Sequence, residues 1–404
     1  MLTRAGARVW RVGVNGGDSA LWPVRGSYIP FRQPLSDWPD FLGRLLDDKD
    51  ITDVVLYGDT RPLHLTAARL AQARGLTLHV FEEGYLRPYW VTYERGGSNG
   101  NSRLMSMSVD QMRAALRDSA IEHHAAPARW GDMREHMFWG AVYHGFVLAG
   151  ARAYRAFRPH RSLGVVDEFL LYLRRFLLLP LHRLERAAAT LRIRYGGFPY
   201  HLVLLQLAHD ASFLKHSRFA SMEEFLQEVL DGFARGAPRH HHLVFKAHPL
   251  EDGRVALKPA IRRIAARLGV ADRVHFVRGG KLGRLLNHAR SAVTVNSTAG
   301  QQALWRGLPL RIFGDAVYGK PEFVSFQPLP EFFADPVRPD SRAYRDFRQY
   351  LLETSQVPGG FYSARGRRQL LRQVVDMMLQ REDPYDALSC GKAAPRQQLH
   401  LVPR

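Results

Sequence analysis

Residues 292–305 read AVTVNSTAGQQALW, and this stretch decides the class of fold. The run 292–295 is short, apolar and partly β-branched, as expected for a strand that is buried in a sheet. The next residues, Asn296-Ser297-Thr298, carry the amide and hydroxyl side chains that favour a helix start, and an apolar helix follows. A buried strand that turns directly into a helix is typical of an α/β domain with a parallel sheet.

The same strand–helix rhythm extends outward on both sides of this stretch. In the C-terminal half, strands are predicted at 201–207, 243–247, 274–277 and 310–313, and helices at 222–234, 261–268, 282–289 and 300–305. In the N-terminal half, strands are predicted at 7–14, 51–57 and 76–81, and a helix at 62–73. Two α/β units predict two domains with a ligand cleft between them.

The pattern also suggests where the domains begin and end. We expect an N-terminal domain over 1–220, with a helical insertion at about 104–195, and a C-terminal domain over 221–335. Helices are expected over 336–382, and a disordered tail over 383–404. Leu2–Gly6 resembles the last turn of a helix with its glycine cap, which indicates that a first strand and most of a helix are missing from this chain.

Charge narrows the class of partner. The 404 residues contain 57 Lys and Arg against 38 Asp and Glu, a formal charge of +19. This surplus favours a polyanionic partner, such as nucleic acid, an anionic membrane surface or phosphorylated substrates. No nucleic-acid-binding motif is recognisable. Cys390 is the single cysteine, so the chain forms no internal disulfide.

Hydropathy predicts a cytoplasmic protein. The N-terminus has no apolar core of the secretory type, and the longest uncharged stretch, 136–151, is shorter than the ~20 residues that span a bilayer. Ten arginines alternate with large apolar residues over 152–194. This segment is either an interfacial helix that binds anionic lipid or a helix with a buried apolar face and a solvated basic face. The sequence favours neither interpretation.

Polar residues follow several of the predicted strands, where ligands of parallel sheets bind. Lys246-Ala-His248-Pro249 and Asn296-Ser297-Thr298-Ala-Gly300 follow two strands of the second unit, and the latter opens a helix whose free N–H groups favour an anion such as phosphate. The alternatives are a plain helix cap and an ordinary loop histidine. Neither a metal-ligand spacing nor a GxxxxGK[ST] phosphate loop occurs.

Carboxylates follow two further strands. Glu82-Glu83-Gly84 ends the strand at 76–81, and either acid is a candidate general acid or base if it lies in a cleft. Gln206-Leu-Ala-His-Asp210 ends the strand at 201–207, and Asp210 is a candidate nucleophile or electrostatic stabiliser. The alternatives are a solvated acidic loop for the first pair and a helix-capping residue for Asp210.

Four motifs occur in the order Phe81-Glu-Glu-Gly-Tyr-Leu-Arg-Pro88, Gln206-x-x-x-Asp210, Lys246-x-His-Pro249 and Asn296-Ser-Thr-x-Gly300. Together they resemble the capsule polysaccharide synthesis family, the bacterial β-Kdo transferases that build the lipid-linked linker of group 2-type capsules. The turns Asn15–Asp18 and Tyr57–Asp59 are also similar to that family. The length best suits members that add the first Kdo to phosphatidylglycerol.

This resemblance implies a GT-B type glycosyltransferase of two Rossmann-like domains that transfers Kdo from CMP-β-Kdo with retention. Glu82 or Glu83 would be the acid/base acting on the acceptor, and Asp210 the nucleophile. The CMP-sugar would be held by Gln206, Lys246, His248, Pro249, Asn296, Ser297, Thr298 and Gly300, without a metal or other cofactor. The implied partners are CMP-Kdo, an anionic lipid acceptor, the inner face of the cytoplasmic membrane and other capsule assembly proteins.

Three other hypotheses remain open from the sequence. The first is a transferase for CMP-sialic acid or a nucleotide-diphosphate sugar on the same architecture. The second is a non-catalytic part of capsule export. The third is a nucleic-acid binder, which charge alone suggests. Donor screening separates the first from a Kdo transferase. Replaceable carboxylates would indicate the second, and salt-sensitive binding to any duplex the third.

Overall fold

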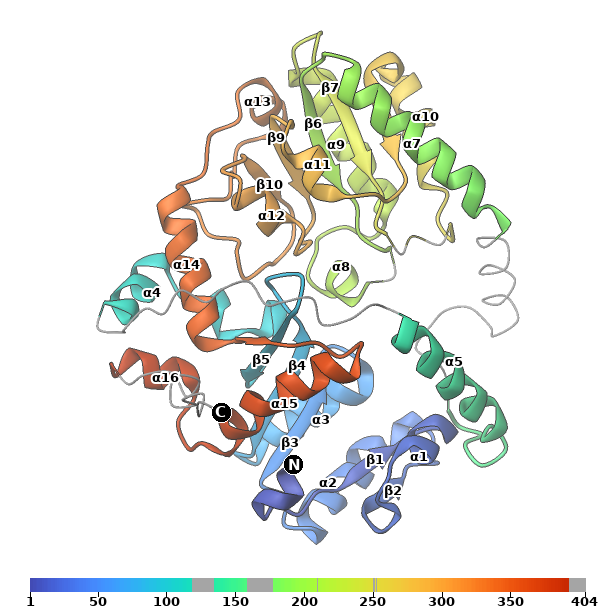
Figure 1. The fold of residues 1–404 in the computed structure, drawn as a ribbon, viewed down its shortest axis with the longest axis vertical. Coiled ribbons are helices and arrows are strands. Elements are labelled where there is room, and N and C mark those ends of the chain that lie inside the picture. Colours follow the sequence, from blue (N-terminus) through green and yellow to red (C-terminus); the bar gives the residue numbers. More distant parts are fainter. Residues whose placement is uncertain (118–133, 158–176, 209, 250, 252, 392–404) are drawn as a thin grey trace. The chain divides into compact units, whose positions relative to one another are not determined.

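The computed structural model describes residues 1–117, 134–157, 177–208, 210–249, 251 and 253–391. The chain divides into two compact units, and each contains its own sheet (Figure 1). Unit 1 comprises Met1–Arg103, Arg113–His160 and Gln349–Arg404, and unit 2 comprises Leu104–Met112 and Arg161–Arg348. The chain therefore leaves unit 1 and later returns to it.

Unit 2 is built around a sheet of five parallel strands. These are β6 (Tyr200–Leu204), β7 (His242–Lys246), β8 (Val274–Val277), β9 (Ser291–Thr294) and β10 (Leu310–Ile312), in the spatial order β10-β9-β6-β7-β8. The chain starts in the middle at β6, adds two strands on one side, and then adds two on the other. This is the doubly wound order of a Rossmann-like domain, and its topological switch point lies at the carboxyl ends of β6 and β9.

Both faces of this sheet are buried, which explains why its strands read as continuous apolar runs. One face packs against α9 (Met222–Gly236), α10 (Leu257–Arg267) and α13 (Leu329–Ala334) through residues such as Val203 and Phe245. The alternate residues, such as Leu202 and Val244, are also fully buried. Contacts with the strands come in addition from α12 (Gly300–Leu304) and α7 (Leu179–Tyr195).

Unit 1 contains a mixed sheet of four strands. These are β3 (Asp53–Tyr57), β4 (Thr77–Glu83), β5 (Trp90–Arg95) and β11 (Gln356–Pro358), in the order β11-β5-β4-β3. Only β3 and β4 are parallel. Helices α2 (Trp38–Asp48) and α3 (Pro62–Ala73) pack on the face that carries Leu78 and Val80, whereas α15 (Ala364–Leu379) packs with Val91 and Tyr93.

The remaining described elements are shorter or lie outside the sheets. A separate parallel pair is formed by β1 (Arg11–Gly13) and β2 (Tyr28–Pro30). The other helices are α1 (Gly16–Leu21), α4 (Val109–Leu116), α5 (Arg134–Ala149), α8 (Ala211–Lys215), α11 (Leu282–Leu286), α14 (Ser341–Thr354) and α16 (Pro384–Ser389). Short 3-10 turns are Leu2–Ala5, Arg25–Ser27, Leu35–Asp37, Asn99–Asn101, Arg103–Met105 and Ala271–Arg273.

Several local features follow directly from the sequence. The helix at 62–73 has the predicted bounds, and Ser221 caps α9 by accepting a hydrogen bond from the Glu224 N–H. The turn Leu2–Ala5 ends on Gly6, whose φ of 91° is the left-handed conformation of a glycine cap. Helix α7 begins at Leu179, so that Pro180 occupies its first turn, where proline is tolerated.

The predicted domain limits differ from the structure. The first domain was expected to reach residue 220, but Tyr200–Leu204 pairs with β7 and β9 and so belongs to the sheet of unit 2. Within the helices expected over 336–382, Gln356–Pro358 forms β11 and pairs with β5 in unit 1. The tail was expected to be disordered from 383, but α16 is ordered around buried Tyr385 and is capped by Asp383.

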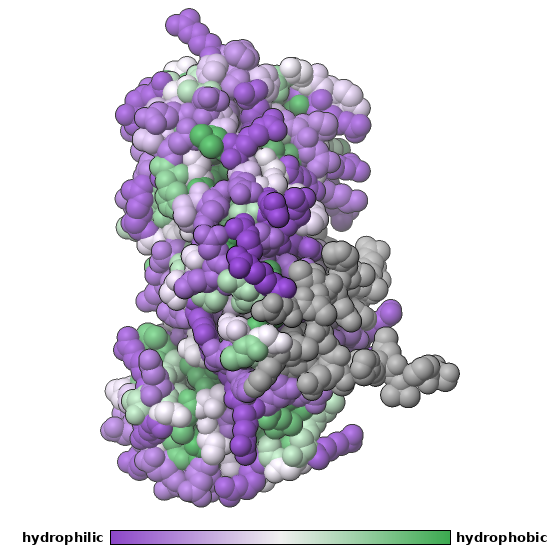
Figure 2. Space-filling view, turned by 90° about the vertical axis from the view of Figure 1, so that its left-hand side faces the viewer, coloured by the Kyte–Doolittle hydropathy of each residue, from purple (hydrophilic) through white to green (hydrophobic). Residues whose placement is uncertain are grey.

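Within the described ranges, no helix is long and apolar enough to cross a membrane. The molecular face drawn in Figure 2 is mostly hydrophilic, with hydrophobic side chains in separate patches. The insertion expected at 104–195 contains α4, α5 and α7 in its described part. Its other residues, including part of the arginine-rich segment 152–194, lie outside the described residues.

Candidate functional site

Two side-chain amides connect β6 and β9 at the switch point of unit 2. Gln206 Nε2 donates to Asn296 Oδ1 at 2.8 Å, and the Asn296 backbone N–H donates to Gln206 Oε1 at 3.0 Å. Asn296 Nδ2 also donates to the His216 carbonyl at 3.0 Å. Both side chains are only 5% exposed. The structure therefore shows Gln206 and Asn296 fixing the two loops against each other, and their contact with a ligand stays a prediction.

The turn between β9 and α12 is compact. Ser297 Oγ accepts from the Ala299 N–H at 3.2 Å, and the Ser297 carbonyl accepts from the Gly300 N–H at 2.9 Å and from the Tyr318 hydroxyl. A Cβ atom on Gly300 would lie 2.8 Å from that hydroxyl, so glycine is needed for this close packing. Ser297 and Thr298 stay half-buried, at the start of α12. The turn thus holds two hydroxyl side chains at the edge of the sheet where ligands bind.

Lys246 and His248 lie at the carboxyl end of β7. Lys246 is 5% exposed, and its Nζ donates to the Ala247 carbonyl at 3.3 Å. Burial lowers the pKa of Lys246 to about 8. His248 is half-buried, and its carbonyl accepts from the Glu251 N–H at 3.0 Å. Strongly shifted pKa values are more frequent at functional sites than elsewhere, so Lys246 stays a candidate site residue.

We expect Lys246→Met to stabilise the protein at pH 7, because the folded chain no longer holds a buried charge. A pKa of about 8, against 10.5 for an ordinary lysine, corresponds to a cost of about 3 kcal/mol below pH 8. The cost shrinks as the pH rises toward 10.5, because the unfolded chain then also loses its proton. Urea unfolding at pH 7 and pH 9.5 measures the difference in the free energy of unfolding between wild type and variant.

The exposed Lys215, changed to Met, is the matched control and should leave the free energy of unfolding nearly unchanged at both pH values. A gain in the Lys246 variant that is the same at both pH values would contradict a buried ammonium as its cause.

Asp210 follows β6 and immediately precedes α8. Its backbone N–H donates to the Leu207 carbonyl, and its carbonyl accepts from the Leu214 N–H, both at 3.0 Å. The second bond is the first turn of α8, so Asp210 occupies the capping position of a short helix. It is half-buried. A role as nucleophile and a role as helix cap are therefore both compatible with the position of Asp210.

A cavity of about 510 Å³ opens at the carboxyl ends of β7 and β8, a size typical of small-molecule sites. His248 and Pro249 line it after β7, and Arg278, Gly279 and Gly280 line it after β8. Further lining comes from Phe276 of β8, the loop before α10, the start of α10 and one side of α7. Sequence reasoning found only the His-Pro part of this cavity, because the other parts come from segments without a motif.

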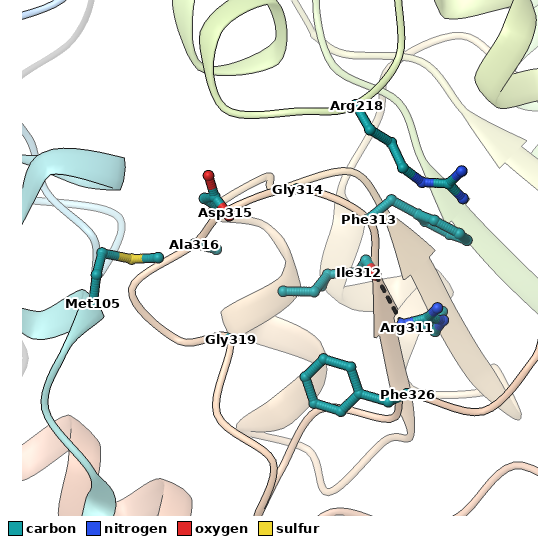
Figure 3. A pocket seen from close by; sticks show the side chains of 10 residues that line it. All are labelled: Met105, Arg218, Arg311, Ile312, Phe313, Gly314, Asp315, Ala316, Gly319 and Phe326. Carbon is teal, nitrogen blue, oxygen red and sulfur yellow. Dashed lines mark hydrogen bonds between the residues drawn. The ribbon is translucent and has the colours of Figure 1, made fainter.

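A second cavity of unit 2, of about 300 Å³, lies at the end of β10 (Figure 3). Its arginines lie against aromatic rings: the guanidinium carbons of Arg311 and Arg218 are 4.8 Å and 5.4 Å from the ring centre of Phe313. Arg311 Nη1 donates to the carbonyls of Ile312 and Ser325. None of the residues singled out in the sequence lines this cavity.

In unit 1, Glu82 and Glu83 are the last two residues of β4 and point to opposite faces of the sheet. Glu83 shares the α15 face with Phe81, and its Oε1 accepts from the Tyr57 hydroxyl at 3.3 Å. Burial, together with the Glu83 carboxylate, raises the pKa of Tyr57 above its ordinary value, so this hydroxyl stays a donor. Glu82 shares the opposite face with Val80.

Two turns that resemble the family have structural partners in unit 1. Gly58, with a φ of 68°, donates its N–H to the Phe81 carbonyl at 2.8 Å. The buried Asp59 accepts from the Ser98 N–H at 2.9 Å, which ties this turn to the chain after β5. Asn15 caps α1 instead of closing a turn, and its Nδ2 donates to the Tyr143 hydroxyl of α5 at 2.8 Å.

His241 and His242, where β7 begins, have different partners. His241 Nδ1 lies 3.1 Å from His201 Nε2, and His242 Nδ1 lies 2.8 Å from His275 Nε2. Burial lowers the pKa of His201 to about 3 and of His275 to about 4, so both are neutral near pH 7. In the part of the chain that the structure describes, no group of three or more His, Cys, Asp or Glu side chains could hold a metal ion.

Comparison with known proteins agrees with the motif order. Residues 52–362 match the family described as capsule polysaccharide biosynthesis protein. The capsule polysaccharide export protein KpsS of Escherichia coli is 30% identical over 367 residues, covering 89% of this chain and 92% of KpsS. The capsule polysaccharide modification protein LipB of Neisseria meningitidis is 30% identical over 372 residues, covering 90% and 87%. The chain therefore belongs to the capsule polysaccharide biosynthesis protein family, which confirms the resemblance.

Among solved structures, one that is similar is "Thermosulfurimonas dismutans KpsC, beta Kdo 2,7 transferase". It is 14% identical, with a TM-score of 0.40, and the match covers 83% of this chain and 86% of that chain.

Proposed function

We propose that this protein is a glycosyltransferase that moves Kdo from CMP-β-Kdo to a phosphatidylglycerol-type lipid in the synthesis of the capsular polysaccharide linker. One observation carries the proposal. Three motifs from distant parts of the chain follow neighbouring parallel strands of unit 2, with Gln206 after β6, His248 after β7 and Ser297 after β9. This edge of a doubly wound sheet is where a nucleotide binds. Membership of the capsule family supports the biosynthetic context.

The side chains of these motifs supply the groups that transfer from a CMP-sugar requires. A CMP-sugar has a single phosphate, and hydrogen-bond donors at His248, Ser297 and Thr298 stabilise the charge that develops as CMP leaves. The Asp210 carboxylate forms a bond to the anomeric carbon of Kdo, and the bonding electrons leave with CMP. An acceptor hydroxyl then displaces Asp210 and gives its proton to Glu82 or Glu83, so two inversions result in retention.

The lipid acceptor is the second part of the proposal. Helix α5 of unit 1 exposes Met137, Phe138 and Trp139, which are 69%, 61% and 47% accessible. Large apolar side chains on a helix surface favour contact with the headgroup region of a membrane. The net charge of +19 favours anionic lipid. We propose that the protein acts at the inner face of the cytoplasmic membrane, with other capsule assembly proteins.

The experiment measures CMP release from CMP-Kdo by the full chain, with phosphatidylglycerol vesicles, phosphatidylcholine vesicles or none. We expect release only with phosphatidylglycerol, together with a Kdo-modified lipid detected by mass spectrometry. Nucleotide release from CMP-sialic acid or a nucleotide-diphosphate sugar, with none from CMP-Kdo, would identify that other sugar as the donor. The E. coli relative is named an export protein; absence of turnover with every donor would favour a non-catalytic role in export.

A further inference from the structure

Helix α7 lines the 510 Å³ cavity of unit 2, although none of the four motifs includes it. Its contribution comes from one side of the helix: Leu178, His182 and Arg186 follow each other at intervals of four residues, and Arg183 lies three before Arg186. All four line the cavity together with residues that follow β7 and β8 in the chain. The arginines of α7 thus belong to the same cavity as His248.

Ion pairs hold α7 in this place. Glu185 pairs with Lys258 of α10, and its Oε2 lies 3.6 Å from Arg278 Nε after β8. The hydrogen bond from Lys258 and the charge of Arg278 lower the pKa of Glu185 below its ordinary value. The helix also contacts β8. Helix α7 is therefore held against unit 2 by contacts with α10 and with the end of β8.

Gly280 makes room for one of these arginines. Its φ is 85°, and a Cβ atom built there would lie 3.3 Å from Arg186 Cδ. The aliphatic part of Arg186 thus packs directly over the loop after β8. Arginine side chains commonly pack their stems on a surface while the guanidinium stays free to bind.

The charges in the cavity are not balanced. Lys258 and Arg278 share the single carboxylate of Glu185. Arg183 and Arg186 form no ion pair with any residue that the structure describes. Among the lining residues, Glu251 is the one carboxylate against four Lys and Arg side chains. A partly enclosed cavity with this surplus attracts an anion.

We infer that α7 is part of the nucleotide site of unit 2, and that Arg183 and Arg186 bind the anionic nucleotide of the donor. The choice of a cytidine nucleotide rests on the proposed function; the anionic character of the ligand rests on the cavity itself. Guanidinium groups suit this role because they form paired, charge-assisted hydrogen bonds with phosphate oxygens. Donor affinity then depends on a helix outside the Rossmann-like core.

Calorimetric titration of the full chain with CMP tests this inference. We expect Arg183→Gln and Arg186→Gln each to raise the Kd for CMP about tenfold, the size expected for one lost charge-assisted hydrogen bond. Arg194→Gln is the matched control, because Arg194 is exposed on the same helix and does not line the cavity. Titration with cytidine, which lacks the phosphate, should differ little between wild type and variants. Thermal unfolding confirms that each variant is folded.

The outcomes separate this inference from the proposed function. If wild type binds CMP and the Kd values of both cavity variants stay within twofold of that of Arg194→Gln, the proposed role of α7 is wrong. The proposal of a CMP-sugar donor is then unaffected. If wild type binds UDP instead of CMP, and Arg186→Gln weakens that binding, the proposal of a CMP-sugar donor is wrong. The proposed role of α7 in nucleotide binding is then supported. If folded wild type binds neither CMP nor UDP, both are overturned.

Discussion

Asp210→Asn is expected to reduce CMP release from CMP-Kdo at least about 10³-fold, because an amide cannot take the place of a carboxylate nucleophile. The choice of asparagine separates the two roles that the fold allows for Asp210. Asparagine caps a helix as well as aspartate does, so the first turn of α8 and the unfolding temperature should be preserved. A variant that is stable and inactive would assign chemistry to Asp210.

Asp340→Asn is the control for this experiment. Asp340 lies in the same unit and holds the start of α14, since its Oδ1 accepts from the N–H groups of Arg342 and Ala343. It should retain both stability and activity. Full CMP release by Asp210→Asn, with phosphatidylglycerol present, would show that Asp210 only caps α8 and that another group is the nucleophile.

The second large effect is expected from Glu82→Gln, which should lower the rate of Kdo transfer to phosphatidylglycerol about 10²–10⁴-fold, the usual contribution of a general acid or base. Glu83→Gln should cost less than tenfold. The two side chains lie on opposite faces of β4, so a single ligand meets only one of them. Glu83 already accepts a hydrogen bond from Tyr57, which suits a positioning role.

Glu82 lies where β3 ends, and a Cβ atom built on Gly58 would come within 3.0 Å of Glu82 Oε2. The carboxylate therefore sits beside a turn at the carboxyl edge of the sheet. Rates measured over a series of pH values, with thermal unfolding of both variants, check the assignment. A larger loss in Glu83→Gln would exchange the two roles, and full activity in both variants would remove the pair from the mechanism.

The sequence predicted the strands of unit 2 to within a few residues, for a physical reason. Strands buried on both faces are short apolar runs, and each ends at polar or glycine residues that cannot continue the run. The same pattern placed His248 and Ser297 at strand ends. Because parallel strands end at one edge of their sheet, the sequence could also predict that these residues lie on the same side.

The errors in the predicted domains concern pairing between distant segments. β6 reads as a strand, but nothing local shows that it pairs with β7 and β9 instead of continuing the first unit. β11 is three residues long and lies between two helices, and only its pairing with β5 makes it a strand. Hydrogen bonding across a sheet leaves no periodic signal in such a short segment.

By itself, the sequence determined the α/β class, because apolar periodicity and turn chemistry act over a few neighbouring residues. The order of its four motifs pointed to the capsule polysaccharide family, which the family match confirms. Only the tertiary structure decided what these motifs meet. It joined Gln206, after β6, to Asn296, after β9, and it brought α7 to the cavity that His248 also lines. Those contacts depend on strand order and helix packing, which bring together residues far apart in the chain; the two amides are 90 positions apart.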